Sequence, residues 1–416
     1  MSDPIRRTIE AVWHMDSAKI IARLARMLRD VSRAEEFAQD ALVSALEQWP
    51  VRGIPDNPAA WLMTTARNRA IDHLRHLKLT ERKSALMIDD LEPDMAGEEA
   101  IADDLLRLIF VACHPVLSTD ARVALTLRML GGLSTAEIAR AYLTTEAAIQ
   151  QRIVRAKRTL SEARVPFEVP PEAERNARLA SVLEVIYLIF NEGYTATAGD
   201  EWMRPGLCDE ALRLARILAE LTPSDAEAHG LAALLEIQAS RTRARIGPRG
   251  EPILLLQQDR ARWDPLMIER GLTALARAES LGGSLGPYAL QAGIAACHAR
   301  ARVAEDTDWV RIVALYDALF ELAPSPVVAL NRAVAVSMAY GPAAGLSVLD
   351  ELRDEPRLAE YYLLPSARGD LLEKLGRFEE ARVEFARAAS LTHNQRERTL
   401  LLARSSACES SPRSAH

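Results

Sequence analysis

The sequence predicts an all-α protein in which two small helical domains, joined by an acidic linker, are followed by a helical-repeat domain. Aromatic residues make up only 5% of the 416 residues. Ala, Leu and Arg dominate, and these side chains lose little freedom in a helix. Apolar residues recur at helical spacing between breaks rich in proline and glycine. We expect domains over residues 1–83, 105–165 and 172–406, with the linker over 84–104.

The bulk composition excludes several classes of protein. A formal net charge of −7 argues against a surface uniformly covered by nucleic acid, but it allows local basic patches. No apolar stretch approaches the ~18 residues of a membrane span, and the N-terminus has no signal core. We therefore expect a cytoplasmic protein with no cofactor and no metal site. Its scattered cysteines indicate reduced thiols, and they are Cys113, Cys208, Cys297 and Cys408.

The first domain contains an acidic helix ahead of a loop over Val51–Pro58. By their spacing, Glu36, Gln39 and Asp40 share one exposed face of this helix. The face is either simply solvated or a docking surface for a basic partner helix. The sequence leaves both interpretations open.

A basic helix over 59–77 follows the loop. Asn57 is expected to cap it, with Pro58 at its first position. Asn68 can donate to and accept from a base, whereas Trp61 is better suited to anchoring the core than to stacking on bases. The basic patch comprises Arg67, Arg69, Arg75, Lys78, Arg82 and Lys83, with His73 and His76 among them.

Residues 84–104 are predicted to form a flexible acidic linker. Eight carboxylates and no basic residue lie between Asp89 and Asp104, and Pro93 and Gly97 interrupt the stretch. A second boundary is expected at Val165–Pro171, where prolines favour extended chain.

The domain over 105–165 carries a helix-turn-helix pattern. Ser134 and Glu137 form a capping box ahead of a short helix, and Thr145 can cap the helix that follows. The inner face of this second helix is predicted to be Ile149, Ile153, Ala156 and Leu160. The outer face carries side chains that bind base edges and phosphates, or a merely solvated basic surface: Glu146, Gln150, Gln151, Arg152, Arg155 and Arg158.

Two signals predict tetratricopeptide-like repeats over 172–406. The stretch around Pro223 resembles the stretch around Pro324, 101 residues later, which is close to three units of ~34 residues. Near the end, Ala367–Ala388 fits one helix–turn–helix hairpin with Gly376 at the turn. A generic helical hairpin is the alternative for either signal alone.

Three motifs occur in order along the chain: Ala34–Ala41, Ala60–Arg75 and the helix-turn-helix ending at Lys157. In this combination the chain resembles the extracytoplasmic-function sigma factors of RNA polymerase, and most of all their subgroup with a long tetratricopeptide-like extension. The resemblance implies a transcription initiation factor and no enzyme. The first domain would bind core RNA polymerase and the minus-ten promoter element, and the helix-turn-helix would bind the minus-thirty-five element. The acidic linker would pass through the polymerase cleft.

The resemblance also assigns residues to each contact. Core polymerase would be bound by Asp30, Glu35, Glu36, Gln39 and Asp40. The minus-ten element would be bound by Asp56, Asn57, Trp61, Arg67, Asn68 and Arg75. The minus-thirty-five element would be bound by Thr145, Glu146, Gln150, Gln151, Arg152 and Arg155.

The extension is expected to regulate activity from within the chain, so we expect no separate anti-sigma factor. It would contact the sigma domains or the polymerase, or bind a protein or peptide ligand. A polar and aromatic set suits either such an interface or the stapling of turns between repeats: Asn191, Glu192, Tyr194, Trp202, Arg204, Arg260 and Trp263.

Two rival functions would need other features of the sequence. A one-component helix-turn-helix regulator with a helical-repeat sensor would need neither the acidic helix nor the separate basic patch. An enzyme in the extension would need a catalytic motif, and no serine-hydrolase, P-loop or metal-ligand pattern is present. Gly282–Gly286 is more typical of a turn than of a phosphate site.

Overall fold

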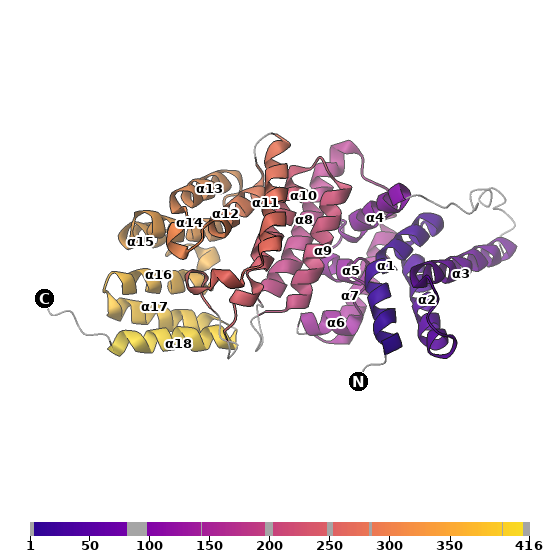
Figure 1. Ribbon diagram of the computed structural model, residues 1–416, viewed down its shortest axis with the longest axis horizontal. Helices are drawn as coiled ribbons and strands as arrows, with labels where there is room; N and C mark the ends of the chain where they lie inside the picture. The colour runs from indigo at the N-terminus through magenta and orange to yellow at the C-terminus, as the bar shows by residue number, and fades with distance from the viewer. Residues whose placement is uncertain are drawn as a thin grey trace. The chain divides into compact units, whose positions relative to one another are not determined.

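The computed structural model describes residues 4–80, 98–142, 144–195, 203–247, 253–282, 285–392 and 394–410 (Figure 1). Helices are the only regular secondary-structure elements among these residues, which confirms the predicted all-α class. The chain divides into two compact units, Met1–Leu188 and Ile189–His416, and the boundary falls inside helix α8 (Glu172–Tyr194).

The first helical domain consists of α1 (Pro4–Leu28), α2 (Val31–Arg52) and α3 (Pro58–Thr80). As predicted, the Asn57 side chain accepts a hydrogen bond from the backbone N–H of Ala60, three residues on. The core between the three helices is built from large apolar side chains that are almost fully buried: Ile9, Ile20, Ile21 and Leu24 of α1, Trp49 of α2 and Leu62 of α3.

The helix-turn-helix domain consists of α4 (Glu98–Ala112), α5 (Thr119–Met129), α6 (Thr135–Ala141) and α7 (Glu146–Glu162). Both hydrogen bonds of the predicted capping box join Ser134 and Glu137, and Thr145 caps α7 by accepting from the N–H of Ala148. The predicted inner face of α7 is confirmed as buried: Ile149, Ile153, Ala156 and Leu160.

The predicted linker is too long at its C-terminal end, because α4 begins at Glu98. Asp104 is 1% exposed and forms ion pairs with Arg23, Arg26 and Arg107. Burial raises the pKa of Asp104, and the three cations offset part of this cost. Residues 81–97, which carry most of the predicted linker together with Arg82 and Lys83, lie outside the described residues.

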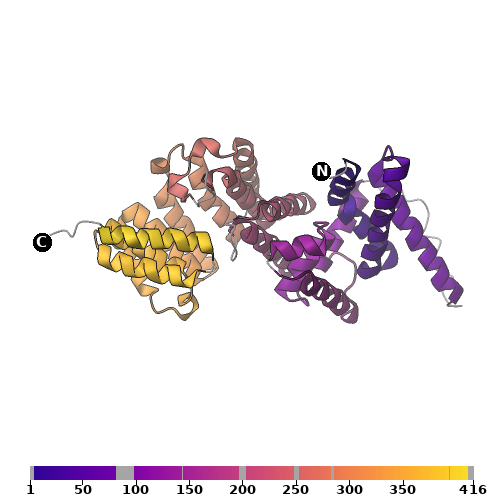
Figure 2. The ribbon, with the colours of Figure 1, turned by 90° about the horizontal axis from the view of Figure 1, so that it is seen from below.

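The second unit continues α8 with ten further α-helices: α9 (Pro205–Leu221), α10 (Ala226–Ser240), α11 (Pro265–Ser280), α12 (Pro287–Arg300), α13 (Trp309–Leu322), α14 (Pro326–Tyr340), α15 (Pro342–Glu351), α16 (Leu363–Lys374), α17 (Phe378–Leu391) and α18 (Gln395–Ser410). Consecutive helices pack against each other, as α17 and α18 do in Figure 2 (yellow). The predicted hairpin is confirmed as α16–α17. Gly376 turns the chain at a φ of 75°, and Gly369 lets Phe385 approach closely.

The structure confirms the predicted helical hairpins, but the stretch between the two prolines contains fewer of them than predicted. Pro223 and Pro324 occupy equivalent turns, the first between α9 and α10 and the second between α13 and α14. Only one hairpin, α11–α12, lies between them, so 101 residues cover two hairpin steps rather than three. The difference arises because the described part of 241–264 forms short 3-10 turns instead of a helix pair.

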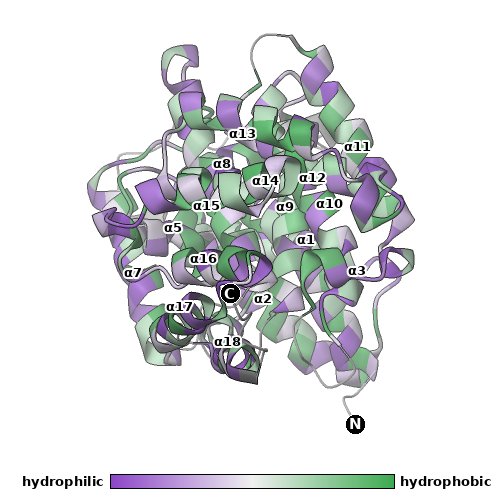
Figure 3. Cartoon of the chain, turned by 90° about the vertical axis from the view of Figure 1, so that its left-hand side faces the viewer, coloured by the Kyte–Doolittle hydropathy of each residue, from purple (hydrophilic) through white to green (hydrophobic). Residues whose placement is uncertain are grey.

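Hydrophilic and hydrophobic residues alternate along helices such as α17 and α18 (Figure 3). Among the helices of the described residues, none combines the length and the apolar character needed to cross a membrane.

Candidate functional site

Helix α7 presents a polar outer face over its buried inner face. Gln150, Gln151 and Arg155 are exposed, and none of them forms an interaction with another described residue. The domain holds these side chains outward because the inner face is locked in the core and Thr145 fixes the start of the helix. Gln and Arg in this position can bind base edges and phosphates in a major groove.

The remaining predicted residues of α7 have partners inside the domain. Glu146 accepts a hydrogen bond from the Thr135 hydroxyl at 2.7 Å, which ties the start of α7 to α6. Arg152 lies 3.4 Å from Asp120 of α5 in a half-exposed ion pair. Val154 is 58% exposed on the outer face. The sequence pattern did not single out this apolar side chain.

Helix α3 carries the predicted minus-ten residues along one face. Trp61, Asn68 and Arg75 are spaced by seven residues, so they align along the helix. Trp61 packs edge-on against the buried Trp49 with ring centroids 5.5 Å apart, which fits the predicted anchoring role. Arg75 is 70% exposed and pairs with Asp72.

Three further predicted residues flank this face. Asp56 and Asn57 are exposed directly before α3 begins, and Arg67 is half-buried. Two other members of the predicted basic patch turn towards α2: Arg69 forms an ion pair with Asp40 at 3.0 Å, and His73 packs against Phe37 with ring centroids 5.4 Å apart.

The predicted docking surface on α2 is only partly exposed. Glu36 is exposed and pairs with Arg33 at 3.0 Å, whereas Gln39 and Asp40 are half-buried. Asp30 caps α2, because its carboxylate accepts from the N–H groups of Ser32 and Arg33.

Glu35, which the resemblance assigns to polymerase binding, does not lie on the exposed surface of α2. Glu35 is 5% exposed, and its carboxylate forms ion pairs with Arg128 of α5, at 2.8 Å, and with Lys157 of α7. Carboxylates are rarely buried unless paired, and both partners lie about a hundred residues further along the chain. The available signal was the position of Glu35 beside Ala34 and Ala38, on the apolar side of the helix.

Glu35 remains charged at neutral pH. Burial raises the pKa of Glu35, but the positive charges and hydrogen bonds of Lys157 and Arg128 outweigh burial. They hold the pKa of Glu35 below its ordinary value of 4.5. The ion pair therefore joins the first helical domain to the helix-turn-helix domain.

A second set of contacts joins the same two domains at the turn before α6. The Trp13 indole N–H donates to the carbonyl of Gly132 at 3.2 Å, and a ring nitrogen of His14 lies 3.1 Å from the carbonyl oxygen of Gly131. Gly132 has a φ of 66°, and a Cβ there would lie 2.8 Å from the Ser17 hydroxyl. The turn can approach α1 this closely because it lacks a side chain.

The first half of α8 is bound to the helix-turn-helix domain. Arg178 donates to the carbonyl of Phe110 at 2.8 Å, and the Ser181 hydroxyl donates to the carbonyl of Cys113 at 2.7 Å. Both carbonyls lie at the C-terminal end of α4, and Arg122 of α5 adds an ion pair to Glu184 at 2.9 Å. The extension therefore starts on a helix that the helix-turn-helix domain holds in place.

Most members of the polar and aromatic set form contacts with turns and helix ends within the extension. Arg260 donates to the carbonyls of His298 and Ala301, at 2.5 and 2.7 Å, which close the end of α12. Arg204 pairs with Glu192, and Trp263 is buried beneath Arg260. Tyr194 accepts from Arg241 at its hydroxyl and from Arg245 at its carbonyl, whereas Asn191 is exposed and Trp202 lies outside the described residues.

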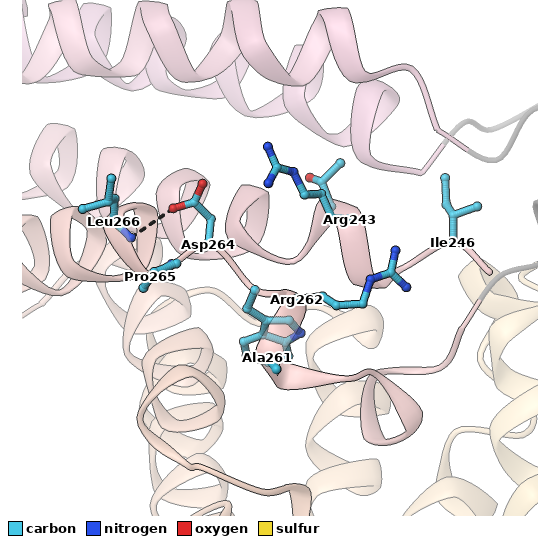
Figure 4. Close-up of a pocket in the computed structure, with 9 residues that line it drawn as sticks. Arg243, Ile246, Ala261, Arg262, Asp264, Pro265 and Leu266 are labelled. Carbon is cyan, nitrogen blue, oxygen red and sulfur yellow. Dashed lines mark hydrogen bonds between the residues drawn. The ribbon is translucent and has the colours of Figure 1, made fainter. Parts of the chain in front are cut away.

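A pocket of about 710 Å³ opens at the start of α11 (Figure 4). Arg243 and Arg262 reach its walls from two different segments, and both are exposed without a described carboxylate partner. Asp264 is engaged in capping, because its carboxylate accepts from the N–H groups of Leu266 and Met267. The pocket thus offers positive charge beside the apolar side chains of Ile246, Pro265 and Leu266.

Comparisons with known proteins match the described domains. Residues 16–80 match sigma-70 region 2, and residues 107–160 match sigma-70 region 4. Residues 178–279 match a family of unknown function (DUF6596). The first helical domain and the helix-turn-helix domain thus correspond to regions 2 and 4.

Relatives extend these matches over the chain. An uncharacterised protein of Rhizobium meliloti (strain 1021) is 45% identical over 384 residues, covering 90% of this chain and 89% of the relative. The ECF RNA polymerase sigma factor SigK of Mycobacterium ulcerans (strain Agy99) is 32% identical over 149 residues, which are 34% of this chain and 78% of SigK. The crystal structure of yeast Tom70 covers 98% of this chain and 85% of Tom70 at 12% identity. Its TM-score of 0.32 does not establish a shared fold.

With region 2 and region 4 in order and such relatives, the chain belongs to the extracytoplasmic-function (ECF) RNA polymerase sigma factors.

Proposed function

We propose that this sigma factor contacts core RNA polymerase through the exposed part of α2, the minus-ten element through α3 and the minus-thirty-five element through α7. The observation that carries the proposal is the outer face of α7, where Gln150, Gln151 and Arg155 are exposed and engage no other described residue. These side chains break no interaction with another described residue when they bind DNA. The rival one-component regulator has no use for a region 2 domain.

Run-off transcription with purified core polymerase tests the DNA contact. Arg155→Ala is expected to weaken promoter binding by about 1–3 kcal/mol, whereas Arg302→Ala, an exposed arginine of the extension, should have no effect. If Arg155→Ala transcribes as the unaltered chain does, the outer face of α7 does not bind the promoter.

The polymerase contact needs a control for the ion pair between Asp40 and Arg69. Asp40→Asn and Arg69→Ala both remove this pair, but only Asp40→Asn removes the docking carboxylate. We expect Asp40→Asn alone to weaken binding to core polymerase in the absence of DNA. Equal losses in both variants would assign the effect to the fold of the first helical domain instead.

We also propose that the arrangement of the two domains is a resting form. The minus-ten and minus-thirty-five elements are about 25 base pairs apart, roughly 85 Å along the DNA. In the structure, Trp13 contacts Gly132 and Glu35 contacts Lys157, and we infer that these contacts must open before α3 and α7 can bind both elements at once. Binding would exchange the contacts of Glu35 for contacts with the polymerase.

For the extension we propose control from within the chain, with no separate anti-sigma factor and with a protein or peptide as its ligand. Two observations support this. Helix α8 is bound to the helix-turn-helix domain through Arg178 and Ser181 and continues into the extension. The pocket beside Arg243 and Arg262 suits a ligand that carries carboxylates.

Two truncated chains separate these contributions. A chain ending at Leu188 keeps the contacts of α8 with the helix-turn-helix domain, and a chain ending at Glu168 loses them. We expect the longer chain to remain folded by circular dichroism and to transcribe at a rate different from the full chain. A folded chain of residues 1–188 that transcribes at the full-length rate under every condition would make the extension a passive appendage.

A further inference from the structure

The outer face of α7 holds one large apolar side chain. Val154 is 58% exposed, while Ile149 and Ile153 on the opposite side of the same helix are buried. An exposed valine on an ordinary surface needs no explanation. This valine lies on the helix face that, under the proposed function, loses its water when the protein binds the minus-thirty-five element.

Val154 is aligned with the polar residues of that face. Gln150 and Gln151 precede it by about one helical turn, and Arg158 follows it by one turn. A rise of 1.5 Å per residue places Val154 about 4.5 Å along the helix axis from Gln151 and about 6 Å from Gln150. Arg158 turns towards Glu162 at 2.6 Å, so it leaves the surface around Val154 open.

The major groove offers one apolar group on its base edges. Every other group that the four base pairs display there is a hydrogen-bond donor or acceptor, and only thymine presents a methyl group. Neighbouring base pairs are about 3.4 Å apart, so the spacing of about 4.5–6 Å on α7 corresponds to about one to two base pairs. A glutamine can bind adenine with two hydrogen bonds. A short A·T-containing sequence therefore complements both kinds of side chain.

We propose that Val154 is a specificity-determining residue of this sigma factor. Its side chain packs against the 5-methyl group of a thymine in the upstream promoter element, within about two base pairs of the base bound by Gln150 or Gln151. The assignment deepens the proposed function and rests on it, because α7 must lie in the major groove. Burial of both apolar surfaces from water provides the preference for thymine.

The experiment compares thymine with deoxyuridine, which lacks only the 5-methyl group. The full chain with core polymerase first selects upstream sequences from a randomised duplex library. Each thymine of the selected element is then replaced by deoxyuridine in turn. At one position we expect the replacement to weaken binding by about three- to tenfold, the loss of one buried methyl contact.

Variants of the valine assign that loss to one side chain. Val154→Ala should bind both duplexes equally, at about the weaker affinity, and Val154→Ile should keep the preference. Val310→Ala is the matched control, because Val310 of α13 is also 58% exposed but lies in the extension. It should bind as the unaltered chain does.

Two results would overturn the assignment. If every thymine tolerates deoxyuridine, or if Val154→Ala keeps the full preference, Val154 does not contact a methyl group. Loss of binding in Arg155→Ala would then leave the proposed function intact. If the unaltered chain selects no upstream sequence at all, α7 does not bind specific DNA, and the proposed function fails together with this inference.

Discussion

In the first unit, Arg128 and Lys157 meet a carboxylate, Glu35, that belongs to another domain, whereas in the second unit Arg260 donates to backbone carbonyls at the end of a neighbouring helix. Both arrangements satisfy buried polar groups. They differ in what happens when the groups separate. Glu35 and its partners are charged side chains that can bind water or another protein, whereas the carbonyls at the end of α12 lose the cation that stabilises the helix end. We therefore expect the first unit to exchange partners and the second to stay assembled.

The largest effect is expected in the second unit. Arg260→Ala removes two hydrogen bonds to carbonyls and one to the Thr307 hydroxyl, so the free energy of unfolding should fall by about 3 kcal/mol. Arg262→Ala, two residues further on and exposed, should change it by less than about 0.5 kcal/mol. Urea denaturation followed by tryptophan fluorescence measures both. Equal changes in the two variants would show that the hydrogen bonds of Arg260 do not stabilise the second unit.

Glu35→Gln tests whether the first unit comes apart instead of unfolding. Loss of the carboxylate leaves Arg128 and Lys157 without their charge partner, which should weaken the contact between the domains by about 2 kcal/mol. Dyes on cysteines introduced at Glu10 and Ser161, both exposed, should report a larger distance by energy transfer.

The matched control for that experiment is Glu36→Gln on the exposed side of α2, which should leave the distance unchanged. Energy transfer that is identical in Glu35→Gln and the unaltered chain would refute the role of Glu35 in closing the unit.

Two glycines with similar backbones extend the comparison. Gly132 and Gly376 have φ values of 66° and 75°, but a Cβ on Gly132 would lie 2.8 Å from the Ser17 hydroxyl, whereas a Cβ on Gly376 meets nothing. Gly376→Ala should cost about 1 kcal/mol, the strain of the left-handed backbone alone. Gly132→Ala should cost more in thermal denaturation and also separate the domains. Ser17→Ala should recover part of the difference.

Acid should weaken the contact between the two domains of the first unit, and this is the smallest of the four predicted effects. Because the pKa of folded Glu35 lies below its ordinary value of 4.5, its contribution to stability is complete above that pH and is lost as the pH falls through the folded pKa. The bonds from Arg260 to carbonyls contain no group that titrates in this range. Energy transfer between the domains should therefore fall as the pH is lowered, whereas the contacts of Arg260 should persist. Energy transfer that stays constant through this range would contradict the role of Glu35.

Local features of this chain could be predicted because they depend on residues three or four apart. The capping box of Ser134 and Glu137, the caps at Asn57 and Thr145 and the hairpin around Gly376 all follow from short-range hydrogen bonds and steric limits. The inner face of α7 follows from the helical period. Since the motifs of regions 2 and 4 are local in the same sense, the family could also be predicted.

The rest depended on which helices meet. The resemblance assigned Glu35 to polymerase binding and the acidic pattern placed Asp104 in a flexible linker, because neither shows which cations approach these carboxylates. Those cations, Lys157 and Arg23 among them, come from distant helices. Val154 could be placed on the outer face by the same helical period, but its 58% exposure is known only from the structure.

By itself, then, the sequence determined the helices, their caps, their order and the membership of the chain in the sigma factors. Only the tertiary structure decided that Glu35 joins the two sigma domains and that Arg260 closes the end of α12. The physical reason is the range of the interactions. Helical periodicity acts over one turn, whereas the burial of a charge is settled by partners that folding alone brings within hydrogen-bond distance.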